Sequence, residues 1–146
     1  MGNDMDALKE LIKKDLVAYD KKLTLDSVGI RHFLQRYIMT PGFKVTFTMR
    51  LCKWLEKRKY LKVLYYLERI KYRRLQVKYG IQIGHRLSVG GGMSINHYGG
   101  IVIGESAIIG ENFNIRNNLT IGHSNSGTPV IGDNVIVGAG AIIIGG

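Results

Sequence analysis

Branched aliphatic residues recur every six positions through the second half of the chain. The steps of six are broken twice, by a step of eight after Ile95 and a step of ten after Ile121. An amphipathic helix repeats every 3.6 residues and a half-buried strand every two, so neither produces this spacing. A short strand followed by a tight turn does. The members of the series are Ile83, Val89, Ile95, Ile103, Ile109, Ile115, Ile121, Ile131, Val137 and Ile143.

Three strand-and-turn units close one triangular coil of about 18 residues, and successive coils stack at roughly 4.8 Å so that their backbones pair. The aliphatic residues fill the interior, while glycine, which usually follows them, serves corners that need unusual dihedral angles. A flexible linker would not place branched aliphatics so regularly. We therefore predict a mainly β part, a parallel β-helix of hexapeptide repeats, over residues 80–146.

The first 79 residues have a different period. Apolar residues recur at steps of three and four over residues 8–19, 30–38, 43–55 and 61–78, as amphipathic helices require. The stretch "TPGF" at residues 40–43 is typical of a helix start, because proline is favoured in the first helical turn. We predict an α-helical region over residues 1–79 that precedes the β-helix.

The formal net charge of +10 is concentrated in one segment. Residues 50–80 contain eleven Lys and Arg residues against two Asp and Glu residues, interleaved with tyrosines and leucines. Such a surface suits either peripheral contact with anionic membrane lipid or a solvated face on helices that pack against the coil. Nucleic acid is the weakest interpretation, because no recognition motif accompanies the charge, and we expect no nucleic-acid partner.

Several classes of protein are excluded by what the sequence lacks. Cys52 is the only cysteine, so an intrachain disulfide and a four-cysteine zinc site cannot form. The first residues carry acidic groups unlike a signal peptide, and no uncharged apolar run approaches the roughly 18 residues of a spanning helix. The four histidines lack a convincing set of partner ligands, so we expect no metal. We expect a cytoplasmic protein, membrane-associated if the basic segment binds lipid.

One histidine stands at the step of eight, in "SINHYGGIVIGES" at residues 94–106. This corner, together with "VIGDNVIVGAGAIIIGG", resembles the hexapeptide-repeat acyltransferases, in the branch of the serine acetyltransferases and related acetyltransferases of capsular and exopolysaccharide synthesis. The resemblance covers residues 80–146 and extends to the "TPGF" helix. It implies a left-handed coil, an acetyl-CoA-dependent O-acetyltransferase activity and a homotrimer.

The resemblance also implies roles for single residues. The family's general base is the histidine of this corner, which matches His97 and would take a proton from an acceptor hydroxyl. Gln82 stands where the family has a supporting aspartate, fifteen residues earlier. It could orient an imidazole but cannot stabilise its cation as a carboxylate does. The family's acceptor-binding aspartate is Asn96 here, and its arginine and histidine are Gly127 and Thr128.

The loss of these charges argues against the serine zwitterion and favours a neutral acceptor, namely a sugar hydroxyl of a surface polysaccharide. His123, in the same loop as Thr128, is expected to form a wall of the acceptor or coenzyme cleft. Acetyl-CoA is expected in the groove between trimer subunits, although the residues named for it could equally be plain coil corners. They are Gly122, Gly138, Ala139, Gly140 and Ala141.

Two alternatives stay open. The first is serine O-acetylation for cysteine biosynthesis, which uses the same chemistry. The second is a non-catalytic β-helix that serves as an assembly module, favoured by Gln82 and by the end of the sequence at "AIIIGG", in mid-repeat. Family members continue with further coils that supply more of the coenzyme site. We therefore expect the coil to be truncated at its C-terminus, which leaves the activity of this stretch alone open.

Overall fold

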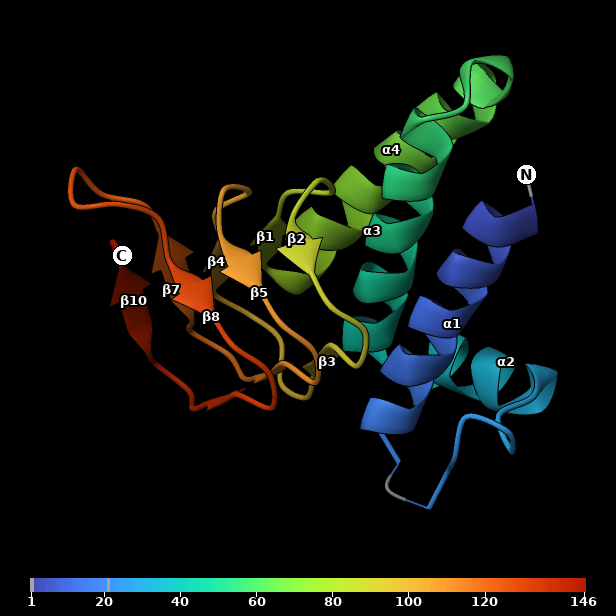
Figure 1. The fold of residues 1–146 in the computed structure, drawn as a ribbon, viewed down its shortest axis with the longest axis horizontal. Helices are drawn as coiled ribbons and strands as arrows, with labels where there is room; N and C mark the ends of the chain where they lie inside the picture. Colours follow the sequence, from blue (N-terminus) through green and yellow to red (C-terminus); the bar gives the residue numbers. More distant parts are fainter. Residues whose placement is uncertain (1, 21) are drawn as a thin grey trace.

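The computed structural model describes residues 2–20 and 22–146 and consists of a helical part followed by a coil of short strands (Figure 1). The helices are α1 (Gly2–Ala18), α2 (Ile30–Met39), α3 (Pro41–Glu56) and α4 (Lys62–Tyr79), with a short 3-10 turn, η1 (Lys59–Leu61), between the last two. The predicted helical region and the parallel β-helix after it are both confirmed.

Helix ends follow the local sequence. Pro41 occupies the first turn of α3, where a missing N–H costs no hydrogen bond. Gly80 ends α4 in the left-handed conformation, with φ of 62°, and its N–H is directed to the carbonyls of Gln76 and Val77. A left-handed residue at this position is favourable mainly for glycine. The chain therefore turns sharply from α4 into the first strand. Within the described residues, no helix is long and apolar enough to cross a membrane.

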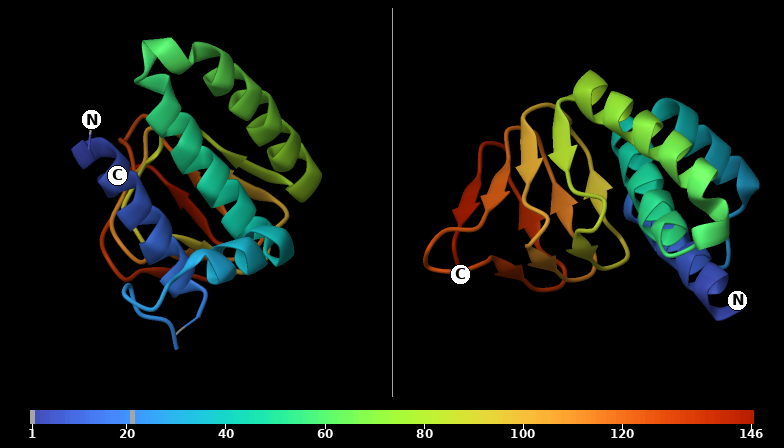
Figure 2. Two further views of the ribbon diagram at one scale, coloured as in Figure 1. Left: turned by 90° about the vertical axis from the view of Figure 1, so that its right-hand side faces the viewer. Right: turned by 90° about the horizontal axis from the view of Figure 1, so that it is seen from above.

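The coil consists of three parallel sheets that form the faces of a prism (Figure 2). Face A contains β1, β4, β7 and β10, face B contains β2, β5 and β8, and face C contains β3, β6 and β9. The chain thus completes three coils and begins a fourth. The strands are β1 (Ile81–Ile83), β2 (Ser88–Val89), β3 (Ser94–Ile95), β4 (Ile101–Ile103), β5 (Ile108–Ile109), β6 (Asn114–Ile115), β7 (Thr120–Gly122), β8 (Val130–Ile131), β9 (Ile136–Val137) and β10 (Ile142–Ile144).

The strand register explains the two long steps in the series. Ile83 pairs with Ile103 and Ile103 with Ile121, so members of the series lie above one another and point inward. The extra residues lie outside this stack, in the corner 96–100 between β3 and β4 and in the loop 123–129 between β7 and β8. Each insertion therefore bulges outward and leaves the interior undisturbed.

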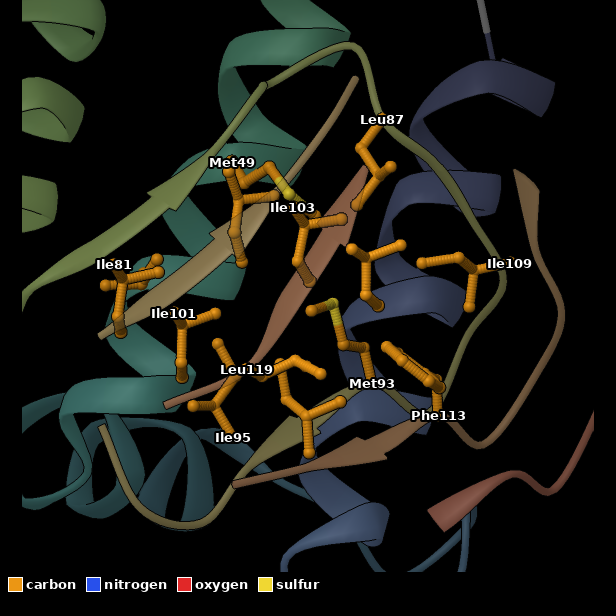
Figure 3. Close-up of a cluster of buried hydrophobic side chains, with 14 of the residues drawn as sticks. Met49, Ile81, Leu87, Met93, Ile95, Ile101, Ile103, Ile109, Phe113 and Leu119 are labelled. Carbon is orange, nitrogen blue, oxygen red and sulfur yellow. The ribbon is translucent and has the colours of Figure 1, made fainter. Parts of the chain in front are cut away.

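The interior of the coil is continuous with the helical part. Figure 3 shows Met49 of α3 among the isoleucines of the first coils, in the same buried cluster as Met93. Val45 and Cys52 of α3, and Tyr72 of α4, belong to the same buried cluster. A β-helix end without such cover would expose its apolar interior and unpaired strand edges. The helices thus serve as a cap on the first coil.

A buried ion pair fixes this cap to the coil. The Asp15 carboxylate of α1 accepts hydrogen bonds from Arg50 of α3, with Nε at 2.5 Å and Nη2 at 2.9 Å. It also accepts the backbone N–H groups of Gly92 and Met93, both at 2.9 Å. Arg50 donates in turn to the carbonyl of Gly90 at 2.6 Å. Both charges are almost fully buried, so each depends on these partners.

Only part of the apolar series on α2 is packed. The rings of Phe33 and Tyr37 lie edge-on to Phe47 of α3, at 5.0 and 5.5 Å between centroids. Ile30 and Ile38, which belong to the same sequence series, are 73% and 64% exposed. The aromatic side of the helix therefore makes the contact, and the aliphatic side faces solvent.

We expect Asp15→Ala to lower the free energy of unfolding by about 3–5 kcal/mol, because it leaves the buried Arg50 guanidinium without a counter-charge. Urea denaturation followed by circular dichroism measures this change. Asp6→Ala is the matched control: it removes the exposed ion pair with Lys9 and should cost no more than about 0.5 kcal/mol. Equal losses in the two variants would show that the buried pair does not hold the cap.

Candidate active site

His97 lies on the corner 96–100, at the edge of the prism where face C meets face A. Its side chain is exposed, and the C-terminal end of α4 packs against the corner. The ring of Tyr98 contacts Tyr79, in the last turn of α4, edge-on at 5.2 Å between centroids. The N–H of Ile101 donates to the carbonyl of Gly80 at 3.0 Å. The end of α4 therefore determines where the corner, and His97 with it, is placed.

Further corners stack on that of His97 along the same edge. The N–H of Asn118 donates to the carbonyl of Gly99 at 2.9 Å, and the N–H of Gly140 donates to the carbonyl of Asn117 at 3.1 Å. The corner 138–141, which contains the predicted coenzyme residues Gly138, Ala139, Gly140 and Ala141, thus lies two coils from His97. At the usual strand spacing the separation is about 10 Å.

This last corner consists of small residues, with the sequence Gly-Ala-Gly-Ala. Such residues would let a narrow chain such as a pantetheine arm approach the backbone closely, so the predicted coenzyme role stays a prediction. Gly122, the remaining predicted coenzyme residue, lies on β7 at the other edge of face A.

Asn96, next to the candidate base, is engaged on face C. Its Nδ2 donates to Oδ1 of Asn114 at 3.2 Å, and Asn114 Nδ2 donates to Ser94 Oγ at 2.9 Å. This ladder connects two successive coils and engages the Asn96 amide in the single chain. Its predicted acceptor-binding role stays a prediction.

The loop 123–129 forms a small closed hairpin. Ser124 and Gly127 exchange two backbone hydrogen bonds, at 3.0 and 3.1 Å, and Ser126 N–H donates to Ser124 Oγ. The loop follows β7 and precedes β8, so it lies at the edge where face A meets face B. The structure therefore brings His123, Gly127 and Thr128 together, but in one chain face A separates them from His97.

Gln82 lies between these two edges, on the outer side of face A. It belongs to β1 and pairs in register with Val102 of β4. Among the described residues, the structure shows no hydrogen bond between Gln82 and His97. The predicted orienting role is therefore not visible in the single chain. The outer side of the same face also carries Val102 and Ile142, which are 39% and 73% exposed.

The sequence interpretation missed a buried polar cluster centred on His85. His85 lies in the turn after β1 and is only 6% exposed. Its Nε2 is 3.2 Å from Tyr65 Oη and 3.3 Å from Glu56 Oε2, while Nδ1 is 3.8 Å from Glu105. These partners come from α3, α4 and the second coil. Nothing in the local sequence around His85 indicates them.

This cluster lines a groove on face A that also contains Gln82. Arg69 and Arg86 line the same groove. Burial lowers the pKa of His85, while the hydrogen bond from Arg86 lowers the pKa of Glu56. Residues 2–20 and 22–146 contain no group of three histidine, cysteine, aspartate or glutamate side chains placed to hold a metal ion.

We expect Gly100→Ala to destabilise the corner. Gly100 has φ of 65°, and a Cβ there would overlap Oδ1 of Asn118. Strain of this kind costs about 1–3 kcal/mol, which urea denaturation measures. Gly104→Ala is the control, because a Cβ at Gly104 would make only ordinary contacts, the nearest at 3.5 Å to the carbonyl oxygen of Ile121, and should change stability by no more than about 0.5 kcal/mol. A Gly100→Ala variant as stable as the control would contradict the tight packing of this corner.

Buried His85 should make the stability of the chain depend on pH. Because the pKa of His85 is lower in the folded chain than in the unfolded chain, its contribution to stability is complete above about pH 6.5 and is lost as the pH falls below this value. The free energy of unfolding should therefore decrease between about pH 7.5 and pH 5 more steeply in the wild type than in His85→Gln. Denaturant titrations across this range measure both slopes. Parallel slopes would mean that burial does not oppose the protonation of His85.

No family model matches this chain. The serine acetyltransferase of Buchnera aphidicola subsp. Schizaphis graminum is 32% identical over 121 residues, which are 80% of this chain and 45% of the relative. A serine acetyltransferase of Helicobacter pylori is 31% identical over 112 residues, 74% of this chain and 63% of the relative. The chain thus spans from under half to about two thirds of the length of these curated relatives.

Solved structures agree in fold. Serine acetyltransferase isoform 3 of Entamoeba histolytica, in complex with cysteine, superimposes with a TM-score of 0.70 at 28% identity, over 94% of this chain and 48% of that one. Soybean serine acetyltransferase complexed with serine gives a TM-score of 0.72 at 25% identity, over 94% and 55%. With the interrupted β-helix and the helical cap described above, this chain belongs to the hexapeptide-repeat acyltransferases, in their serine acetyltransferase-like branch.

Proposed function

We propose that the chain provides the catalytic edge of an acetyl-CoA-dependent O-acetyltransferase with serine as its acceptor. The observation that carries the proposal is the exposed His97 on an interrupted corner, two coils along the same edge from the small residues of the corner 138–141. Relatives about 30% identical carry the name serine acetyltransferase, which favours serine.

The reaction needs a base for the acceptor hydroxyl and hydrogen-bond donors for the oxygen of the thioester carbonyl. When bound, acetyl-CoA supplies the thioester that is attacked. His97 takes the proton from the acceptor hydroxyl as the oxygen bonds to the thioester carbon, and returns a proton to the sulfur as the carbon–sulfur bond breaks. Backbone N–H groups of the corner would stabilise the negative charge that develops on the carbonyl oxygen.

The site is completed by a second copy of the chain in a homotrimer. In one chain, His97 and the loop 123–129 lie at opposite edges of face A. If three copies turn face A toward a common axis, the edge carrying His97 in one copy meets the edge carrying the loop in the next. Gly122, His123, Gly127 and Thr128 of the neighbouring copy would then form the wall of the cleft. The exposed Val102 and Ile142 would be covered in the same assembly.

A sugar hydroxyl is the second candidate acceptor. The residues 123–129, "HSNSGTP", contain no lysine or arginine to hold a serine carboxylate, and Asn96 offers no negative charge to a serine amine. A neutral hydroxyl donor makes no such demand. The acceptor assay below distinguishes the two candidates, and also separates both from a non-catalytic assembly module.

We expect His97→Ala to lower kcat/KM by about 10²–10⁴-fold, because the acceptor hydroxyl then loses its base. Release of free thiol from acetyl-CoA, measured with serine and with a panel of sugars, reports the reaction. His32→Ala, on α2 and away from both edges, is the control and should keep wild-type turnover.

The other possible results of the thiol-release assay distinguish the remaining hypotheses. Unchanged turnover in His97→Ala would overturn the assignment of the base. A preference for a sugar over serine would replace the proposed acceptor but keep the chemistry. A wild-type chain without turnover on any acceptor would favour the assembly module.

A further inference from the structure

The outer face of α4 is apolar and faces solvent. Val63 is 76% exposed and Val77 is 68% exposed, at opposite ends of the helix. Figure 2 shows α4 running along the outside of the helical part, with α3 on its inner side. The exposed apolar residues of η1 and α4 are Tyr60, Val63, Leu64, Tyr66, Leu67, Ile70 and Val77.

These residues form a stripe along the helix. Val63, Leu67, Ile70 and Val77 follow one another at steps of four, three and seven, which place them on one side of an α-helix. The eighteen residues of α4 span about 27 Å. The opposite side is already used, because Tyr72 is buried and donates to the carbonyl of Ile83 at 2.7 Å. The stripe is therefore not the side that packs on the coil.

All exposed charges around the stripe are positive. The only acidic residue between positions 57 and 80 is Glu68, which is half-buried and forms an ion pair with Lys71 at 3.0 Å. The solvent-facing cations along the stripe are Lys59, Lys62, Arg73, Arg74 and Lys78. The surface thus combines exposed apolar area with uncompensated positive charge.

The first part of the basic segment, residues 50–56 of α3, is not available to a partner. Cys52 and Leu55 of α3 are fully buried, and Arg50 is held by Asp15. A second copy is also a poor partner for the stripe, because two such faces would bring cations against cations. An anionic surface with an apolar layer beneath it matches both properties, and this is the structure of a membrane that contains acidic lipid.

We propose that the outer face of α4 docks on the surface of an anionic lipid membrane. The helix lies parallel to the membrane plane, with Val63, Leu67 and Ile70 at the boundary between headgroups and acyl chains and the cations against the headgroup phosphates. Tyr60 and Tyr66 suit the same interfacial layer. The inference does not depend on the proposed acetyl transfer.

Vesicle sedimentation of the full chain, without acetyl-CoA, tests this proposal. We expect at least ~10-fold more binding to vesicles of phosphatidylcholine with phosphatidylglycerol than to phosphatidylcholine alone, and less binding as salt is raised. Val63→Asp/Ile70→Asp should abolish binding to the mixed vesicles. Arg73→Glu/Arg74→Glu should reduce binding to the mixed vesicles by about 10-fold, which is the factor by which the acidic lipid raises it.

The matched control is Ile30→Asp/Ile38→Asp, which makes the same change at two exposed isoleucines of α2. It should bind like the wild type, and circular dichroism checks that every variant is folded. Absence of binding, equal binding to both kinds of vesicle, or equal loss in the control overturns the proposal. So does a smaller assembly for Val63→Asp/Ile70→Asp in analytical ultracentrifugation, because the stripe would then be covered by another copy. The thiol-release assay is independent of all these outcomes.

Discussion

The ion pair of Asp15 and Arg50 joins three segments that are far apart in the sequence. It connects α1 to α3, and both to the corner around Gly92 at the start of the coil. A buried charge without its partner is strongly unfavourable, so this geometry accepts few alternatives. Once α3 is fixed in this way, Val45 and Met49 close the first coil. The stacking of later coils then begins from a covered end.

The helical cap also determines the position of His97, through the contacts that α4 makes with the first coil. Gln76 of α4 donates to the carbonyl of Ile83 at 2.6 Å, as Tyr72 does at 2.7 Å, which ties the last turns of α4 to β1. Gly80 then reverses the chain, and its carbonyl accepts the N–H of Ile101 just after the corner of His97. The catalytic proposal thus concerns a residue on the coil whose placement depends on a helix end.

Sequence periodicity predicts the coil well because only one geometry satisfies a six-residue repeat of branched aliphatics. It also contains a signal that the site prediction did not use. Counting the units in threes places the step of eight after Ile95 at one edge and the step of ten after Ile121 at another. His97 and His123 are therefore separable within one chain from sequence alone.

Other features of the site depend on contacts that periodicity does not encode. His85 meets Glu56 and Tyr65 from two helices, and Asp15 meets Arg50 across 35 positions. The spacing of apolar residues also predicts a helix, but it does not say which side of that helix packs against the rest of the chain. On α2 and α4 the exposed side carries aliphatic residues, because aromatic contacts on α2 and the Tyr72 hydrogen bond on α4 determine the orientation. Such choices arise only when the elements meet.

The outer face of α4, which we propose docks on a membrane, and His97, the proposed base, are connected through α4 itself. Tyr79, in the last turn of α4, contacts Tyr98 beside His97, while the stripe of Val63 and Ile70 lies on the outer side of the same helix. A chain docked through α4 would hold the corner of His97 near the membrane surface. Free serine gains nothing from that position, whereas a sugar hydroxyl carried on a lipid is concentrated there. Free serine still reaches His97 from solution, so docking would add access to lipid-linked acceptors without excluding serine, and vesicle binding and acceptor choice remain separate questions.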